Sequence, residues 1–176
     1  PESFRARFNV DVRVLSQVLS IDRAAHSVQV RNVKTGQTYQ ERYDKLILAT
    51  GAAPVAPPLP GLGAPFVHTL RTIPDTLAIK EAAEQLRGKA HAPAVVIGGG
   101  AIGCEMAENL KRVGLSVTLV EMADHLIAPL DADMAADVHN YIRQKGVRLC
   151  LNTAVTGIEQ GAQGGFVLTQ AGKLPA

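Results

Sequence analysis

Residues 95–103 have the sequence Val-Val-Ile-Gly-Gly-Gly-Ala-Ile-Gly, in which an apolar run leads into spaced glycines. Gly98 permits a tight turn from a strand into a helix, Gly100 has no Cβ to keep an anion from the backbone, and Gly103 lets the new helix approach the sheet. This pattern is typical of a βαβ unit that binds the pyrophosphate of a dinucleotide at the helix N-terminus. It therefore constrains the fold more than any other feature of the chain.

The residues around the glycines support a βαβ unit. Ala94–Ile97 is apolar, as in a buried parallel strand. After the glycines, Gly114 stands where a helix usually ends, and Val117–Val120 predicts the second strand. The predicted buried face of the helix consists of Ile102, Met106, Leu110 and Val113.

Glu121 follows the second predicted strand, about twenty residues after the glycines. An acid at this position accepts hydrogen bonds from the ribose hydroxyls of the adenosine and repels a 2′-phosphate. The sequence therefore predicts NADH as the ligand rather than NADPH. The predicted site consists of Gly98, Gly99, Gly100, Ala101, Ile102, Gly103 and Glu121. The alternative is a structural βαβ unit beside an incidental surface glutamate.

Composition narrows the classes of partner. The net charge of +2 comes from interspersed charges without a basic run, and the chain has no Trp, so neither nucleic acid nor an anionic membrane is an expected partner. The uncharged stretch Leu46–Val67 contains five prolines, which a membrane-spanning helix would not tolerate. The first residues are polar and charged, unlike a signal peptide, and a cytoplasmic location is expected.

The two cysteines, Cys104 and Cys150, lie far apart and lack His or Cys partners at metal-ligand spacing. No metal site is therefore expected. Cys104 falls in the predicted βαβ helix and Cys150 in a predicted strand. Both are expected to be buried, inert thiols, which makes them poor redox candidates.

A proline-rich stretch at about residues 54 to 65 divides the chain. The strands predicted before it are Asn9–Ile21, Ser27–Val33, Gln37–Tyr43 and Lys45–Gly51. After it, helices are predicted at Ile73–Leu86 and Asp131–Lys145, and strands at Val147–Leu151, Val155–Glu159 and Phe166–Thr169, the last two around the glycine-rich residues 161–165.

The predicted fold is α/β. Residues 64–176 form a Rossmann-like βαβ dinucleotide-binding domain with a parallel sheet and a β-meander, and a partial β-rich segment over residues 1–63 precedes it. Neither piece is expected to be complete, since the chain does not begin with Met and its first segment resembles the middle of a domain. An internal fragment of a longer protein is therefore expected.

Several segments together resemble the pyridine nucleotide-disulphide oxidoreductase family, in particular its coenzyme A-disulphide reductase and NADH oxidase branch. They are Tyr43–Ala52, the proline-rich loop, Thr69–Arg71 and Gly98–Leu110. The resemblance covers essentially the whole chain. It implies an NAD(P)H-dependent flavoenzyme in which NADH reduces FAD, and FAD then reduces a disulphide, a persulphide or O2.

The resemblance also implies roles for single residues. Residues 1–63 would belong to an FAD-binding domain, and FAD contacts are expected at Val18, Ala49, Thr50, Gly51, Ala52 and Arg71. Ile102 and Glu105 match positions near the nicotinamide, although Glu105 could instead form an ion pair between domains. Arg13 matches a basic position for the phosphates of coenzyme A, and the alternative is a solvated arginine on a strand. Leu130 lies near a position where some members carry a Tyr that covers the nicotinamide, so stacking of that kind is not expected.

Other parts of the family pattern have no counterpart in residues 1–176. They are the redox-active cysteine, the first FAD-binding glycine motif, the second FAD-contacting aspartate segment and the dimerisation domain. No catalytic residue is therefore expected in this chain, and the isolated fragment should be inactive. The parent protein is expected to be a homodimer that acts on a small molecule. The alternatives are a redox-dependent signalling flavoprotein that resembles apoptosis-inducing factors, or a ferredoxin or rubredoxin reductase, which predicts a basic docking face that the charge pattern does not indicate.

Overall fold

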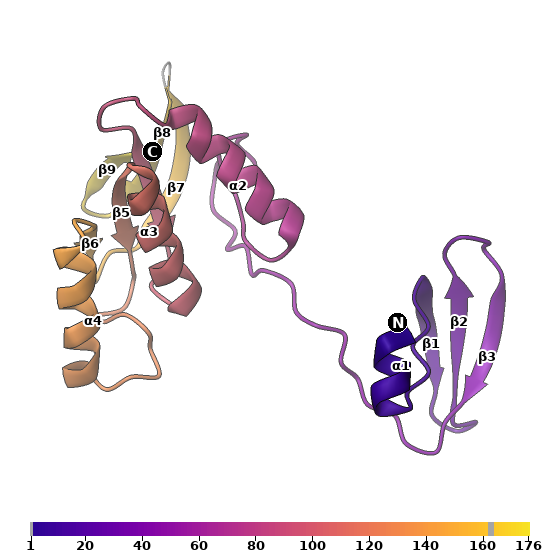
Figure 1. The fold of residues 1–176 in the computed structure, drawn as a ribbon. Coiled ribbons are helices and arrows are strands. Elements are labelled where there is room, and N and C mark those ends of the chain that lie inside the picture. The colour runs from indigo at the N-terminus through magenta and orange to yellow at the C-terminus, as the bar shows by residue number, and fades with distance from the viewer. Residues whose placement is uncertain (1, 162–163) are drawn as a thin grey trace. The chain divides into compact units, whose positions relative to one another are not determined.

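The computed structural model describes residues 2–161 and 164–176. It contains two compact units, an N-terminal unit that ends at Gly51 and a second unit from Ala52 to Ala176 (Figure 1). The proline-rich connector thus belongs to the second unit by its contacts, whereas the sequence suggested a boundary at residue 63. The assignment of each part to one cofactor stays a prediction.

The N-terminal unit contains one helix and an antiparallel sheet. Its elements are α1 (Glu2–Phe8), β1 (Ser16–Asp22), β2 (Ser27–Asn32) and β3 (Thr38–Arg42), with the strand order β1-β2-β3. The predicted hairpin of β2 and β3 is confirmed, and Gly36 adopts a φ of +76° in its turn.

Two strands predicted for this unit are wrong. The strand expected over Asn9–Ile21 begins only at Ser16, because Ser16 pairs with Asn32, the last residue of β2, and the strand partner ends there. Lys45–Gly51 forms no strand, and Ile47 in its middle is 88% exposed. Alternating or apolar residues form a strand only where a neighbouring strand takes up the backbone hydrogen bonds.

The second unit contains the predicted βαβ arrangement. A parallel sheet has the order β4-β5-β6, and its helices follow the predicted positions closely. The elements are α2 (Ile73–Leu86), β4 (Pro93–Ile97), α3 (Ala101–Val113), β5 (Ser116–Val120), α4 (Ala132–Gln144) and β6 (Arg148–Cys150). Gly114 ends α3 with a φ of +106°, in the left-handed conformation that favours glycine. The α/β prediction is confirmed.

Three layers make up this unit. Leu119 of β5 packs with Ala107 of α3 and Ile142 of α4, whereas Val120 faces Val167 and Leu174 on the opposite side of the parallel sheet. That side is covered by an antiparallel sheet of β7 (Val155–Gly161), β8 (Gly164–Thr169) and β9 (Gly172–Pro175), which confirms the predicted meander (Figure 1). Residues 162 and 163 of its predicted glycine-rich turn lie outside the described residues.

The buried face of α3 differs from the prediction. Cys104 and Ala107 are buried against the sheet, whereas Ile102 is 63% exposed. In α4, similarly, Ala135 is fully buried while Met134 is exposed. Small side chains face the sheet because they allow the helix axis to come close to it, so Ile102 is left on the outer side of α3. Leu110, in contrast, packs against the core as predicted.

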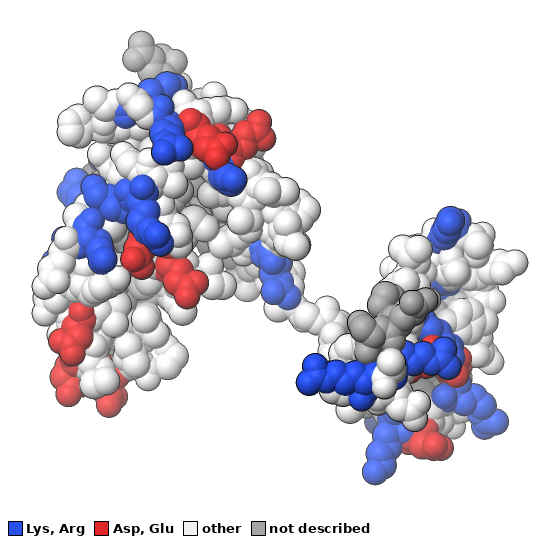
Figure 2. All heavy atoms as spheres, in the orientation of Figure 1, with Lys and Arg blue, Asp and Glu red and all other residues white. Residues whose placement is uncertain are grey.

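In α4 of the second unit, acidic and basic side chains lie at opposite ends of the helix. Asp133 lies in the first turn of α4 and Arg143 in its last turn, where each sign complements the helix dipole. Figure 2 shows acidic side chains over the start of this helix and basic ones over its end. None of the helices in the described residues combines the length and apolar character that crossing a bilayer requires.

The start of α2 carries the predicted capping residues. Thr72 Oγ1 accepts a hydrogen bond from the backbone N–H of Asp75, and Asp75 Oδ2 accepts one from the backbone N–H of Thr72 at 2.7 Å. Pro74 lies in the first turn, where its missing N–H costs nothing. The hydrogen bonds from Thr72 lower the pKa of the Asp75 carboxyl below its ordinary value.

We expect Thr72→Ala to lower the free energy of unfolding by about 1 kcal/mol, because the substitution removes the side-chain cap of α2. Since the pKa of Asp75 is lowered in the fold, the ionised carboxylate stabilises the fold above pH ~4, and this stabilisation is lost as the pH falls through the folded pKa. Thr72→Ala should therefore also reduce the loss of stability in acid. Urea unfolding at pH 7 and pH 3 measures both effects, with the exposed Thr69→Ala as a control that should match wild type.

Candidate functional site

The glycine-rich turn joins β4 to α3 with the geometry that the sequence predicts. Gly98 adopts a φ of +103°, and its N–H donates to the carbonyl of Val120 at 2.9 Å, which ties the turn to β5. A Cβ at Gly103 would overlap the carbonyl oxygen of Gly98. The turn can therefore close in this form only with glycine at both Gly98 and Gly103.

The outer side of the turn is open to a ligand. Gly100 is the N-cap residue of α3 and supplies no side-chain cap, and a Cβ built on it would meet no atom within 4 Å. The N–H groups of Ala101, Ile102 and Gly103 have no carbonyl one turn earlier in the helix to accept their hydrogen bonds. No acidic residue lies in the first turn. These features fit a bound pyrophosphate, which takes hydrogen bonds from such N–H groups.

Glu121 lies directly beside this turn at the end of β5. Its Oε2 accepts a hydrogen bond from the N–H of Gly99 at 2.6 Å, and its Oε1 accepts one from the N–H of Ala123 at 2.8 Å. Each carboxylate oxygen keeps a further lone pair, so this geometry is compatible with the predicted hydrogen bonds from ribose hydroxyls. Sequence reasoning missed the contact by which Glu121 positions the glycine-rich turn.

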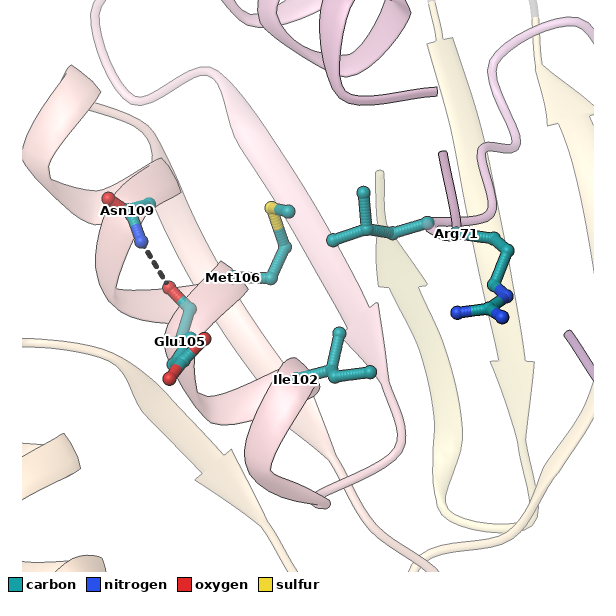
Figure 3. A pocket seen from close by; sticks show the side chains of 6 residues that line it. Arg71, Ile102, Glu105, Met106 and Asn109 are labelled. Carbon is teal, nitrogen blue, oxygen red and sulfur yellow. Dashed lines mark hydrogen bonds between the residues drawn. The ribbon is translucent and has the colours of Figure 1, made fainter. Parts of the chain in front are cut away.

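A cavity of about 270 Å³ lies along the outer face of α3 (Figure 3). Its lining residues are Leu70, Arg71, Ile102, Glu105, Met106 and Asn109. The side-chain amide of Asn109 donates to the backbone carbonyl of Glu105 at 2.8 Å. The structure thus brings Ile102 and Glu105, predicted near the nicotinamide, together with Arg71, predicted to contact FAD. It also explains the exposed apolar side of α3, since Ile102 and Met106 line this cavity.

Leu70, Met106 and Asn109 are lining residues that sequence reasoning missed. Of these three residues, only Met106 was marked in the sequence, because its apolar side chain recurs at helical spacing with Ile102. That spacing was interpreted as a buried helix face. Periodicity alone does not distinguish a face that packs in the core from one that lines a cavity.

The residues predicted to bind FAD are only partly brought together. Arg71 Nε donates to the carbonyl of Ala52 at 2.7 Å, so these two positions meet within the second unit. Val18 lies on β1 of the N-terminal unit, where it is half exposed, and Ala49–Gly51 has no regular secondary structure. Their contacts with FAD stay predictions.

Arg13 lies before β1 and not on a strand, which corrects its expected location. Its Nε donates to Asp11 at 2.9 Å and its Nη1 to Glu41 at 2.5 Å, and its guanidinium lies 5.9 Å from the centre of the Tyr39 ring. The hydrogen bond to Glu41, above all, raises the pKa of Arg13 further above its ordinary value. A coenzyme A phosphate would have to compete with two carboxylates, and the role stays a prediction.

Cys104 is buried, and its Sγ lies 3.6 Å from the carbonyl oxygen of Gly99. Burial, and to a lesser degree the charge of Glu121, raises the pKa of the thiol. The thiol is therefore protonated at neutral pH and unreactive, as predicted. Cys150 on β6 is only partly buried, whereas the sequence suggested full burial.

Known proteins resemble this chain over most of its length. The NADH oxidase of Methanocaldococcus jannaschii is 37% identical over 153 residues, which covers 86% of this chain and 33% of that protein. Coenzyme A disulfide reductase of Staphylococcus aureus is 32% identical over 158 residues, which covers 90% of this chain and 35% of that protein. The chain spans about a third of the length of these curated relatives.

The fold agrees with these similarities. The crystal structure of reduced CoADR-RHD from Bacillus anthracis superposes with a TM-score of 0.81 and 41% sequence identity, over 99% of this chain and 31% of that one. The sequence model of the pyridine nucleotide-disulphide oxidoreductases matches residues 3–175. Because that match includes nearly every residue, the resemblance drawn from the motifs is confirmed, and the chain belongs to the pyridine nucleotide-disulphide oxidoreductase family.

Proposed function

We propose that this chain is the NADH-binding part, with an adjoining FAD-binding segment, of a flavoprotein oxidoreductase that passes a hydride from NADH to FAD. The observation that carries the proposal is the glycine-rich turn, open at Gly100 and held by Glu121 through the N–H of Gly99. An anion-binding helix N-terminus next to a fixed carboxylate suits the two ends of an adenosine diphosphate ribose: the pyrophosphate and the ribose hydroxyls.

Each residue of the site has a binding or positioning role in this proposal. The first N–H groups of α3 bind the pyrophosphate, and Glu121 accepts the ribose hydroxyls and repels a 2′-phosphate. Ile102 and Met106 provide an apolar wall that excludes water near the nicotinamide, with Glu105 beside it. When bound, the reduced nicotinamide supplies a hydride and the flavin accepts it, and the protein orients the two.

We further propose that the parent protein delivers these electrons to a small molecule, either a disulphide or persulphide or O2. The support is sequence similarity to proteins named NADH oxidase and coenzyme A disulfide reductase. The same names give no support to a signalling flavoprotein or to a ferredoxin reductase. A homodimeric parent remains part of the proposal by family resemblance.

Calorimetric titration of the full chain with NADH and with NADPH tests the proposal. We expect tighter binding of NADH, and we expect Gly100→Ala to weaken it about tenfold, because the new methyl group would stand where the pyrophosphate approaches the backbone. The unfolding midpoint should not change, since a Cβ at Gly100 meets no atom within 4 Å. Gly63→Ala is a matched control, because its Cβ also meets nothing. Equal affinity for both nucleotides, or unchanged binding by Gly100→Ala, would contradict the proposal.

A further inference from the structure

Residues 121–131, which connect β5 to α4 and are called the 121–131 loop below, close on the inner side of the glycine-rich turn. The N–H of Ile127 donates to the carbonyl of Gly99 at 2.8 Å, while the N–H of Gly99 donates to Glu121. Leu126 is fully buried, and its side chain fills the space that a Cβ at Gly99 would need. The loop therefore holds both polar groups of Gly99, one residue before the proposed anion site.

The 121–131 loop is in turn held by a side chain from α4. The N–H of Leu126 donates to Nε2 of His139 at 3.0 Å. Because a backbone N–H can only donate, Nε2 must be unprotonated and the ring proton must lie on Nδ1. Protonation of His139 would place a second N–H against that of Leu126 and remove the hydrogen bond.

We propose that neutral His139 is a positioning residue for the nucleotide site, acting through Leu126 and Ile127 on the Gly99 peptide. The chain of contacts runs from α4 through the loop backbone to the turn that binds the pyrophosphate in the proposed function, on which this inference rests. Protonation of His139 loosens the loop and weakens nucleotide binding, which makes the affinity of the site dependent on pH.

The charged groups around His139 shift its pKa in both directions. Burial lowers its pKa most, the positive charges of Arg143 on the same helix and of His125 in the loop lower it further, and Asp124 opposes them. Because the folded pKa of His139 lies below the ordinary value, neutral His139 stabilises the fold above pH ~6.5, and this stabilisation is lost as the pH falls through the folded pKa.

The pKa of His125, in the same loop, is shifted in the opposite direction. Its Nδ1 lies 2.6 Å from Asp124 Oδ1, and this hydrogen bond raises the pKa of His125 above its ordinary value. Protonated His125 therefore stabilises the fold below pH ~6.5, and this stabilisation is lost as the pH rises through its folded pKa. An experiment on His139 must separate these two titrations.

The test compares wild type, His139→Gln and His139→Ala in the full chain between pH 5.0 and 8.0. Calorimetry with NAD+, which tolerates acid and carries the same pyrophosphate, measures affinity, and the exchange rate of the Leu126 amide measures the loop without ligand. We expect His139→Ala to bind NAD+ about tenfold more weakly at pH 8.0, since the buried N–H of Leu126 loses its acceptor.

The His139→Gln variant tests whether the pH dependence comes from the titration of His139. Its side-chain oxygen can accept the N–H of Leu126 but has no proton to gain, so affinity and amide protection should stay near wild-type values at pH 8.0 and should fall less in acid. His125 is present in both proteins, so the difference between wild type and His139→Gln reports the titration of His139 together with its electrostatic coupling to His125. His68→Gln, at an exposed histidine, is the matched control and should follow wild type throughout.

Identical pH profiles for wild type and His139→Gln would overturn the inference, as would unchanged Leu126 protection in His139→Ala. If His139→Ala fails to fold, the comparison with His139→Gln still decides. Failure of the proposed function has a different signature: no variant would bind NAD+ at any pH, while the Leu126 amide would still report whether His139 holds the loop.

Discussion

Gly103→Val will lower the free energy of unfolding of the second unit by about 1–3 kcal/mol and abolish NADH binding. A Cβ at this position overlaps the carbonyl oxygen of Gly98, which is backbone and cannot rotate away, and it also approaches Val96 of β4. Accommodating it requires the start of α3 to move away from the turn, which displaces the N–H groups that we propose bind the pyrophosphate.

Urea unfolding followed by circular dichroism, together with NADH calorimetry, measures both parts of this prediction. Gly63→Val is the control, because a Cβ at Gly63 meets no atom within 4 Å. A Gly103→Val protein with a wild-type unfolding midpoint would show that α3 can move without cost, contrary to the close packing described here. Loss of binding in the control would show that the effect is not specific to the turn.

Glu121→Ala will weaken NADH binding by tenfold or more and also destabilise the fold. The substitution removes the proposed acceptors for the ribose hydroxyls and leaves the N–H groups of Gly99 and Ala123 without partners. A buried donor that loses its acceptor costs about 1–3 kcal/mol. Glu121→Arg should suffer the same structural loss but shift the preference toward NADPH, because a guanidinium attracts the 2′-phosphate that a carboxylate repels.

Thermal unfolding and calorimetry with both nucleotides separate these effects. Glu121→Gln is informative because its amide retains one acceptor oxygen, so its unfolding temperature should lie between those of wild type and Glu121→Ala. The exposed Glu81→Ala on α2 controls for the loss of one negative charge. If the Arg variant kept a preference for NADH, the assignment of Glu121 to the ribose would be wrong.

Local patterns predicted the elements whose ends are marked by particular residues. Thr72 and Asp75 define the start of α2, and Gly114 the end of α3, because caps act within a few residues of the chain. Strand predictions failed over residues 9–15 and 45–51. These segments have suitable residues, but a strand also requires a paired neighbour, and pairing is a property of the tertiary structure.

The face of α3 shows the same distinction within a single helix. Its period was visible in the sequence, yet the buried side proved to be that of Cys104 and Ala107, and Ile102 and Met106 line a cavity instead. Large apolar residues are the usual core residues, so the pattern favoured them. Close approach of a helix to the glycine-rich turn favours small ones.

The sequence by itself determined the glycine-rich turn, the helix that follows it and the acid at residue 121, because each depends on backbone freedom or on spacing along the chain. Only the tertiary structure showed that Glu121 also binds the N–H of Gly99, that Arg71 lies across a cavity from α3, and that His139 holds Leu126. These contacts join residues far apart in the chain, and their partners are chosen by packing and by the need of buried polar groups for hydrogen bonds.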